Sequence, residues 1–307
     1  MATTFGYRTY YRLVYSFTRT RSHKIRILLM LAAFFCVKNT PTFTHRISVQ
    51  AMSMSTKAAT KPLIIFCHGS GDTGSGAQAY VQSLIPNEEY EKWDWEFPTA
   101  TPIPYTIYGG RIESIWYDRV RGFAPQYNEQ TASVEASTDR LLAIIDKQVQ
   151  QNHRSSKNII IGGFSMGGAI ALQTAVRYHA RNNDNQQQQS TTTTTTTTNA
   201  ESAAVNSLGA VFGLSCYLTD DSKVWKILQE TNTAKNWPST FIAHGGSDNF
   251  ILPKWGKSTY ERLVETGIPA TFQMKPNTSH EMVHTEIAQL LGFLTMEIKL
   301  KETNTEL

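Results

Sequence analysis

A short motif in the middle of the chain constrains the fold more than any other feature of the sequence. Residues 159–172 read I-I-I-G-G-F-S-M-G-G-A-I-A-L. The isoleucines are typical of a buried strand, and the stretch rich in alanine and leucine after the glycines is typical of a helix. Gly163, Ser165 and Gly167 therefore form G-x-S-x-G between a predicted strand and a predicted helix, which is the setting of a nucleophile elbow.

Glycines beside Ser165 would let two backbones pass closely, while the serine occupies strained dihedral angles on a sharp turn. The turn would raise the hydroxyl above the sheet at the positively polarised start of the helix. There the backbone amide of Met166 can face a developing oxyanion. The alternative is a glycine-rich turn that only packs closely or binds a phosphate. The rest of the chain has to decide between them.

Strand–loop–helix units repeat along the chain, which predicts a parallel sheet flanked by helices. Strands are expected at 63–67, 93–97, 159–161, 208–214, 240–243 and 270–274. Helices are expected at 77–85, 130–151, from the elbow to about Arg181, and at 222–230, 254–266 and 281–299.

Three residues suited to nucleophilic catalysis each follow a predicted strand, in the order Ser165, Asp248, His280. This is the order found in α/β-hydrolases, and the carboxyl ends of parallel strands converge on one sheet edge. A serine hydroxyl needs an imidazole to accept its proton, and the imidazole needs a carboxylate to orient it. The developing oxyanion needs two donors, for which the amides of Ser70 and Met166 are the candidates.

Other histidines and aspartates are weaker candidates. His284 falls inside a predicted helix, where a packing or solvated role is expected. His68 and His244 each precede a glycine at a strand end and are expected to shape turns. Asp72 and Asp118 do not fit the chain order, and Asp72 is expected to brace the glycine-rich loop.

Two loops complete the predicted site. The glycine-dense segment 68–76 follows the first strand, where an α/β-hydrolase places its second oxyanion amide. A phosphate-binding loop is the rival interpretation, but the segment lacks the Gly-Lys-Ser/Thr ending that such a loop needs. The segment Pro98 to Asp118 contains three prolines and is expected to be a loop. It is either a surface loop over the core or a wall of the substrate cleft.

Charge is distributed unevenly along the chain. Residues 1–61 contain ten Lys and Arg and no acidic residue, which leaves 19 basic and 25 acidic residues in the remainder. Nothing in the mildly acidic remainder indicates nucleic-acid binding. Three cysteines, without metal-binding or disulfide spacing, favour a reducing compartment and predict no metal site.

The segment 1–61 resembles a targeting leader. Its apolar run at 27–37 is too short to span a bilayer. A mitochondrial or plastid transit peptide fits best, and a secretory signal fits less well because the sequon at Asn277 adjoins His280. Translation from Met52 or Met54 would give a cytosolic protein. A cytoplasmic location is expected for the hydrolase domain itself.

Low-complexity sequence separates the elbow helix from the next strand. Residues 182–207 include four consecutive glutamines and eight consecutive threonines, and they are predicted to be a disordered insertion. Residues 301–307 are expected to be a tail.

Five motifs in order resemble the acyl-protein thioesterases, also called lysophospholipase/carboxylesterase hydrolases. They are H-G-S-G-D-T-G at 68–74, the segment 98–118 with Trp116, G-F-S-M-G-G at 163–168, H-G-G-S-D at 244–248 and S-H-E at 279–281. The resemblance covers about 63–298 and looks closest to the lysophospholipase-like protein 1 branch, where Met166 replaces a Gln common elsewhere. Ser70 replaces the usual Leu, but a backbone donor survives that change.

The resemblance implies an α/β-hydrolase domain over 62–300, with a mostly parallel central sheet flanked by helices and no large lid domain. It implies Ser165 as nucleophile, Asp248 as acid and His280 as base, with Ser70 and Met166 forming the oxyanion hole. Its substrate pocket would be lined by a further three residues, Trp116, Gly69 and Gly71. No cofactor is implied.

The implied substrates are S-palmitoylated or otherwise acylated proteins, or small acyl esters and lysophospholipids, with transient contact to a membrane surface permitted. One alternative is a short-chain carboxylesterase or lysophospholipase without a protein substrate. An alternative of another class is a non-catalytic ligand-binding homologue, although a receptor has no need of all three of Ser165, Asp248 and His280. The sequence does not indicate an oligomeric state.

Overall fold

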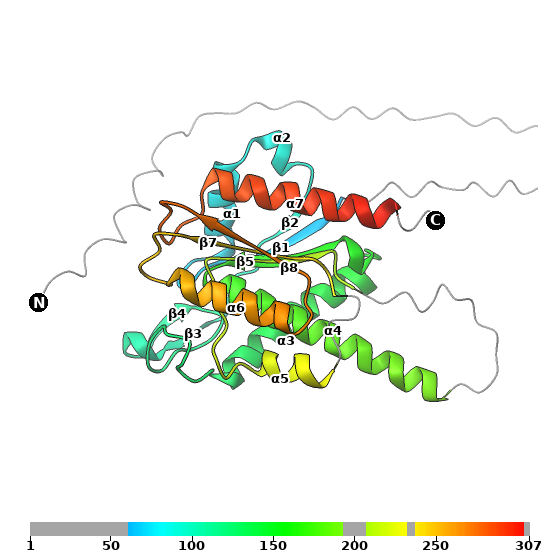
Figure 1. The fold of residues 1–307 in the computed structure, drawn as a ribbon, viewed down its shortest axis with the longest axis horizontal. Helices are drawn as coiled ribbons and strands as arrows, with labels where there is room; N and C mark the ends of the chain where they lie inside the picture. The colour runs from blue at the N-terminus through cyan, green and yellow to red at the C-terminus, as the bar shows by residue number, and fades with distance from the viewer. Residues whose placement is uncertain (1–60, 193–206, 232–236, 304–307) are drawn as a thin grey trace, which may run out of the picture. The chain divides into compact units, whose positions relative to one another are not determined.

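The computed structural model describes residues 61–192, 207–231 and 237–303 (Figure 1). The predicted leader, apart from its last residue, lies outside the described residues, as does the tail from residue 304 onwards.

The centre of the fold is a sheet of six parallel strands in the order β2-β1-β5-β6-β7-β8. The strands are β1 (Leu63–Cys67), β2 (Asp94–Glu96), β5 (Ile159–Phe164), β6 (Ala210–Leu214), β7 (Thr240–Gly245) and β8 (Ala270–Lys275). Strands β1, β6 and β7 are buried along their whole length, because helices cover both faces of a parallel sheet. The α/β-hydrolase fold class predicted from the sequence is confirmed.

Helices form a layer on each face of this sheet (Figure 1). Helices α1 (Gly74–Leu84) and α7 (His284–Thr303) cover the face to which Ile64 and Phe66 of β1 point. Helices α3 (Thr131–Gln150), α4 (Met166–Thr192), α5 (Lys223–Glu230) and α6 (Pro253–Glu265) cover the opposite face, which receives Leu63 and Ile65. Side chains alternate between faces along a strand, so β1 contributes to two separate cores. A short helix α2 (Asn87–Tyr90) precedes β2, and a 3-10 turn η2 (Ser156–Asn158) precedes β5.

The predicted ends of these helices and strands lie within four residues of the observed ends, with α4 as the exception. Local capping explains several of the shifts. Helix α1 begins earlier than predicted because the hydroxyl of Thr73 accepts a hydrogen bond from the Gly76 amide at 3.0 Å. Helix α6 begins at Pro253, whose missing amide costs nothing at a helix start.

The segment expected to be a loop between Pro98 and Asp118 instead contains a hairpin. Strands β3 (Pro102–Tyr105) and β4 (Arg111–Ser114) pair antiparallel, joined by a 3-10 turn η1 (Thr106–Tyr108). Gly109 and Gly110 close the hairpin with φ angles of 70° and 77°, which glycine adopts without steric cost. Pro102 and Pro104 lie in β3, and proline is not expected in a central strand because its nitrogen has no hydrogen to donate. In a two-stranded hairpin each strand has an open edge, where these nitrogens need no partner.

Helix α4 ends later than predicted. The sequence predicted its end near Arg181, followed by a disordered insertion from 182, whereas the helix continues to Thr192. The prediction was wrong over 182–192 because glutamine is a good helix former and no proline or glycine interrupts the run. Of the remainder of the predicted insertion, residues 193–206 lie outside the described residues.

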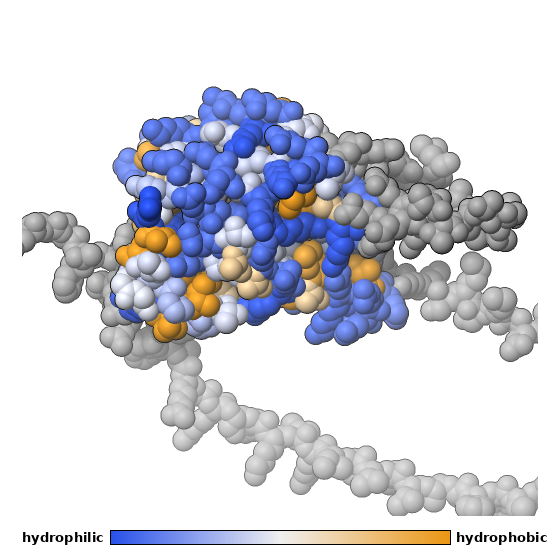
Figure 2. All heavy atoms as spheres, turned by 90° about the horizontal axis from the view of Figure 1, so that it is seen from below, coloured by the Kyte–Doolittle hydropathy of each residue, from blue (hydrophilic) through white to orange (hydrophobic). Residues whose placement is uncertain are grey.

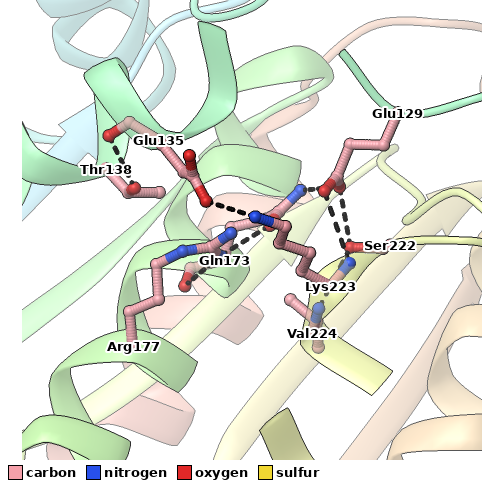
Figure 3. Close-up of polar contacts among 8 residues, drawn as sticks. All are labelled: Glu129, Glu135, Thr138, Gln173, Arg177, Ser222, Lys223 and Val224. Atoms are coloured by element: carbon pink, nitrogen blue, oxygen red, sulfur yellow. Dashed lines mark hydrogen bonds and ion pairs between the residues drawn. The ribbon is translucent and has the colours of Figure 1, made fainter. Parts of the chain in front are cut away.

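Polar contacts link α4, the segment before α3 and the start of α5 (Figure 3). Lys223 at the start of α5 forms an ion pair with Glu135 of α3, with 2.5 Å between the charged atoms. On α4, Gln173 donates to Glu129 at 2.5 Å and accepts from Arg177 at 2.7 Å. The bond between Gln173 and Glu129 ties α4, which begins directly after Ser165 of the predicted elbow, to the segment before α3.

The outward faces of the layer formed by α3 to α6 are mostly hydrophilic, with small separate hydrophobic spots (Figure 2). Among the described residues, we find no helix that combines the length and the apolar character needed to cross a membrane.

An acidic side chain is buried in the first turn of α7. Glu286 is 0% exposed, and burial raises its pKa from 4.5 to about 7, against the opposing charge of Lys275. The folded chain therefore keeps this carboxyl neutral at pH values where the unfolded chain ionises it. The folded state loses stability as pH rises from about 4.5 to about 7 for this reason.

We expect Glu286→Gln to raise the thermal stability above pH 7 and to leave it nearly unchanged near pH 4. The gain at high pH is roughly 3 kcal/mol, because one pKa unit corresponds to about 1.4 kcal/mol. Thermal melts of wild type and variant between pH 4 and 8.5 measure it. The exposed Glu281→Gln is the control and should show no such pH dependence. Equal gains at pH 4 and pH 8 would contradict the burial argument.

Candidate active site

The elbow has the geometry that its sequence predicts. Ser165 stands between the last residue of β5 and the first residue of α4, with a φ angle of 56°. A positive φ is strained for a residue with a side chain, and it is maintained here by the structure on both sides. The Ser165 amide donates to the carbonyl of Leu214 in β6 at 2.8 Å, and its carbonyl accepts from Ala169 at 3.2 Å. The serine is thus anchored to the sheet and to the helix at once.

Two glycines of the motif are required by space. A Cβ atom on Gly163 would lie 2.2 Å from the carbonyl oxygen of Cys67. A Cβ atom on Gly167 would lie 2.0 Å from the same oxygen and 2.5 Å from the carbonyl oxygen of His68. No side chain fits at either position. The end of β1 and the start of α4 therefore approach each other more closely than any residue except glycine allows.

The structure brings Ser165, His280 and Asp248 into one hydrogen-bonded chain. The Nε2 atom of His280 is 2.9 Å from the hydroxyl oxygen of Ser165, and its Nδ1 atom is 2.7 Å from Oδ2 of Asp248. The carboxylate can only accept, so Nδ1 carries the proton. Nε2 is then free to accept the serine proton. The two residues reach Ser165 from loops after β7 and β8, where the parallel strands end.

Asp248 is a buried carboxylate with several donors. It is 1% exposed, and its Oδ1 atom accepts from the amides of Phe250 and Ile251 at 2.9 Å each. Burial on its own raises the pKa of Asp248, but hydrogen bonds from His244 and His280, the charge of His280 and the Ile251 amide lower it well below its ordinary value. The group stays ionised and can hold the imidazole of His280 in one orientation.

The glycine-rich loop passes directly beside Ser165. A Cβ atom built on Gly69 would lie 3.7 Å from the Cβ atom of Ser165. The loop turns through a hydrogen bond from the Asp72 amide to the Gly69 carbonyl at 3.2 Å, with φ of 78° at Gly71. A positive φ at that position is typical of a type II turn. Ser70 lies at the exposed corner of this turn, and Gly71 is exposed beside it.

Met166, the other predicted oxyanion donor, is the first residue of α4. The first amides of a helix have no carbonyl within the helix to bind, and they form its positive end. The Met166 side chain is buried, and its sulfur accepts from the Trp116 amide at 3.3 Å.

Trp116 does not occupy the place that the sequence predicted. Its side chain is 1% exposed, and its Nε1 atom donates to the carbonyl of His68 at 2.8 Å. A ring buried to this degree cannot present a wall to a ligand, so the prediction that Trp116 lines the pocket was wrong. Instead, the indole of Trp116 holds the start of the glycine-rich loop through its hydrogen bond to His68. Gly69 and Gly71 do lie on the loop beside Ser165, and their place in a pocket stays a prediction.

Two phenylalanines that the sequence analysis did not single out flank His280, and a third packs against one of them. The ring of Phe164 lies 4.8 Å from the imidazole and that of Phe250 lies 5.2 Å from it, measured between centroids. Phe123 contacts Phe250 at 4.7 Å. Phe250 is 45% exposed, so an apolar surface borders the reactive atoms. Sequence position offered a signal for two of them, because Phe164 precedes Ser165 and Phe250 follows Asp248 by two residues.

The remaining histidines and aspartates have structural contacts. His244 lies beside Asp248, with 3.5 Å between its Nε2 atom and Oδ2, and the same Nε2 donates to a carbonyl at 2.8 Å. His284 contacts a carbonyl at the end of α1. Asp72 accepts from the next backbone amide at 2.7 Å, as expected of a group that braces the loop. Asp118 accepts from the turn of the hairpin.

A hollow lies between the hairpin segment and the loop after β6, and Arg119 contributes to its lining. The guanidinium donates to the hydroxyls of Tyr105 at 3.0 Å and Tyr117 at 3.2 Å, and it lies over the rings of Tyr117 and Phe123. Both terminal nitrogens of the guanidinium thus donate within the protein, and we place no ligand there.

No group of three metal-ligating side chains occurs within 61–192, 207–231 and 237–303. Cys67 and Cys216 are free and buried, as predicted. Burial raises the pKa of the Cys216 thiol to about 12.

Comparison with known proteins agrees with this geometry. Residues 50–183 match the phospholipase/carboxylesterase family, and residues 123–284 match the α/β hydrolase fold family. Lysophospholipase-like protein 1 of Mus musculus is 30% identical over 75% of this chain and 84% of the mouse protein. Acyl-protein thioesterase 1 of Emericella nidulans is 29% identical over 75% of this chain and 88% of the fungal protein.

Two solved plant structures share the fold. SOBER1 of Arabidopsis thaliana gives a TM-score of 0.61 at 20% identity, covering 78% of this chain and all of that one. Acyl-protein thioesterase 2 of Zea mays gives a TM-score of 0.61 at 22% identity, covering 79% of this chain and 96% of that one. The fold, the arrangement at the elbow and these similarities define the class: the chain belongs to the phospholipase/carboxylesterase family of α/β-hydrolases. The resemblance predicted from the sequence is confirmed.

We expect Gly167→Ala to destabilise the protein by about 3 kcal/mol or more, because the added methyl group would meet two backbone oxygens that cannot both move away. Thermal or urea unfolding measures the loss. Gly292→Ala is the matched control, since a Cβ there meets nothing within 4 Å in the middle of α7. It should stabilise the protein by about 0.5–1 kcal/mol. A Gly167→Ala variant as stable as wild type would contradict the close approach of β1 and α4.

Proposed function

We propose that this protein is a serine hydrolase that cleaves acyl thioesters and esters through an acyl-serine intermediate on Ser165. The observation that carries the proposal is the hydrogen-bonded chain from Ser165 through His280 to the buried, ionised Asp248. At the end of that chain is the half-buried hydroxyl of Ser165, on a strained turn. A structural serine has no need of either arrangement.

In the first half of the reaction, Oγ of Ser165 attacks the acyl carbon and its proton passes to Nε2 of His280. The tetrahedral intermediate collapses as the bond to the leaving sulfur or oxygen breaks, and His280 returns the proton to that atom. In the second half, water attacks the acyl-serine, and His280 accepts a proton from the water. The proton returns to Oγ when the serine is released with the free acid. Asp248 stabilises the imidazolium in both halves.

The oxyanion that forms in each half needs donors that are in place beforehand. We assign this role to the backbone amides of Met166 and Ser70. The Met166 amide belongs to the positive end of α4, next to the nucleophile. The Ser70 amide belongs to the loop that touches Ser165.

The apolar surroundings of His280 support an acyl substrate. Phe164 and Phe250 flank the imidazole on which the leaving group depends, and Phe250 remains half exposed. The names of the relatives point the same way, since the fungal protein at 29% identity is an acyl-protein thioesterase. We propose S-acylated proteins as the partner class. The alternative is a short-chain esterase or lysophospholipase without a protein substrate. The name of the mouse relative, lysophospholipase-like protein 1, supports this alternative.

Turnover of p-nitrophenyl esters from acetyl to palmitoyl tests the proposal. We expect the wild type to hydrolyse at least one of them, and we expect Ser165→Ala to lose all hydrolysis above background while keeping the wild-type melting temperature. An optimum at long chains favours deacylation of palmitoylated proteins, and an S-palmitoylated peptide then tests it directly. An optimum at short chains favours the carboxylesterase. A folded wild type without turnover at any length would overturn the proposal in favour of a ligand-binding protein.

We expect Asp248→Asn to reduce kcat by about 10³–10⁴-fold, because a neutral amide no longer selects the tautomer of His280 that accepts the serine proton. The substitution keeps the size of the side chain, so KM should change little. Steady-state kinetics on the best ester give both values. Asp146→Asn is the control, because Asp146 is also an aspartate but forms an ion pair with Arg181 between α3 and α4 and takes no part in the proposed site. A loss of equal size in both variants would contradict the role assigned to Asp248.

A further inference from the structure

We propose that His68 is the positioning residue of the oxyanion hole: it holds the peptide group between Gly69 and Ser70 so that the Ser70 amide faces the reacting carbonyl. This inference rests on the proposed function, because an oxyanion forms only if Ser165 attacks an acyl group. The sequence offered His68 only as a residue that shapes a turn. Its contacts give it a more specific task.

Both ring nitrogens of His68 are engaged, and together they define its tautomer. The side chain is 0% exposed, immediately after β1. Its Nε2 atom accepts a hydrogen bond from the Ala100 amide at 2.9 Å, so that nitrogen carries no proton. The proton of the neutral ring is therefore on Nδ1. The Nδ1 atom lies 2.6 Å from the Gly69 carbonyl oxygen and donates to it.

The carbonyl of Gly69 belongs to the same peptide group as the amide of Ser70. In a trans peptide the C=O and N–H bonds point in opposite directions. Two donors hold this carbonyl towards the inside of the loop, the ring of His68 at 2.6 Å and the Asp72 amide at 3.2 Å. The Ser70 N–H must then point away from the ring. Within the part of the chain that the structure describes, the Ser70 amide donates to no protein acceptor.

The surroundings of His68 keep the ring neutral and in place. Burial lowers its pKa below the ordinary 6.5, against the opposing effects of its bond to Gly69 and of the charge of Asp72. A protonated ring would set an N–H against the N–H of Ala100. The ring of Trp116 lies 5.1 Å from that of His68, and the Trp116 indole donates to the His68 carbonyl at 2.8 Å. Ala100, which precedes the hairpin, and Trp116, which follows it, thus hold the glycine-rich loop in the arrangement that the proposed reaction needs.

Loss of the Nδ1 donor would leave the carbonyl held only by the longer bond from the Asp72 amide. The peptide group could then rotate, which would turn the Ser70 amide away and bring a carbonyl oxygen towards the oxyanion. Removing one preorganised donor from such a site costs about 10²–10³-fold in kcat. The effect should fall on kcat more than on KM, because the oxyanion exists only along the reaction path.

Two substitutions separate this role from simple packing. In His68→Asn the side-chain amide lies near the position of Nδ1 and can still donate to the Gly69 carbonyl. In His68→Gln the amide reaches the position of Nε2 and can still bind the Ala100 amide, but it cannot reach the Gly69 carbonyl. Both variants place a smaller polar group in the same buried site, so their losses of thermal stability should be similar.

Kinetics on the best p-nitrophenyl ester, together with melting temperatures, provide the test. We expect His68→Gln to lose about 10²–10³-fold in kcat with little change in KM. We expect His68→Asn to remain within about tenfold of wild type, since it keeps the donor. Equal kcat values for the two variants, or a wild-type kcat in His68→Gln, would overturn the role of His68 and leave the serine mechanism intact. A wild type without esterase activity would instead overturn the proposed function.

A second measurement does not depend on enzymatic activity and needs only one of the two variants to fold. Long-range ¹⁵N–¹H spectra of the wild type, assigned through the His68→Asn or His68→Gln variant, whichever folds, report the protonation of each ring nitrogen. We expect His68 to carry its proton on Nδ1 alone from pH 8 down to pH 7. A proton on Nε2, or a doubly protonated ring in this range, would overturn the inference.

Discussion

The close approach of β1 to the first turn of α4 is the constraint on which the rest of the site depends. The carbonyl oxygen of Cys67 occupies the space where a side chain at Gly163 or Gly167 would lie. This contact lets the elbow turn at Ser165 and keeps the loop after β1 beside it. A residue larger than glycine would separate the nucleophile from the loop that carries the Ser70 amide. The positive φ of Ser165 is the local strain that accompanies this packing.

The buried carboxylate of Asp248 determines the position of His280 in the site. Asp248 stays ionised while almost fully buried because two backbone amides and His280 donate to it and the ring of His244 lies beside it. The loop after β7 is thereby shaped around one carboxylate, and the carboxylate orients His280. His68 and His244 stand in equivalent places in this scheme. Each lies at the carboxyl end of a strand, is 0% exposed, and uses a ring nitrogen to bind a carbonyl of the loop that follows.

Much of the fold and the central site residues could be predicted without coordinates. Alternation of strand and helix signals placed the six strands, and the order Ser165, Asp248, His280 identified the three residues that the structure joins. The failures have physical causes. The prolines between Pro98 and Asp118 led us to predict a loop, but the open edge of a two-stranded hairpin tolerates proline. The polar tract after Arg181 led us to end α4 too early. Residues that are too polar to form a core can still form a helix. Trp116 was misplaced because an aromatic residue in a loop resembles a pocket wall until its burial is known.

The sequence by itself determined the elbow, the family and the identity of the residues that meet at the sheet edge. These follow from local sterics and from the period of side chains, which act over a few residues. Only the tertiary structure decided the distances among Ser165, His280 and Asp248, the apolar border formed by Phe123, Phe164 and Phe250, and the tautomer of His68. These depend on contacts between segments far apart in the chain. The donors that bind a side chain, and the segments that bury it, come from distant parts of the chain. No local sequence pattern specifies which segment packs against that side chain.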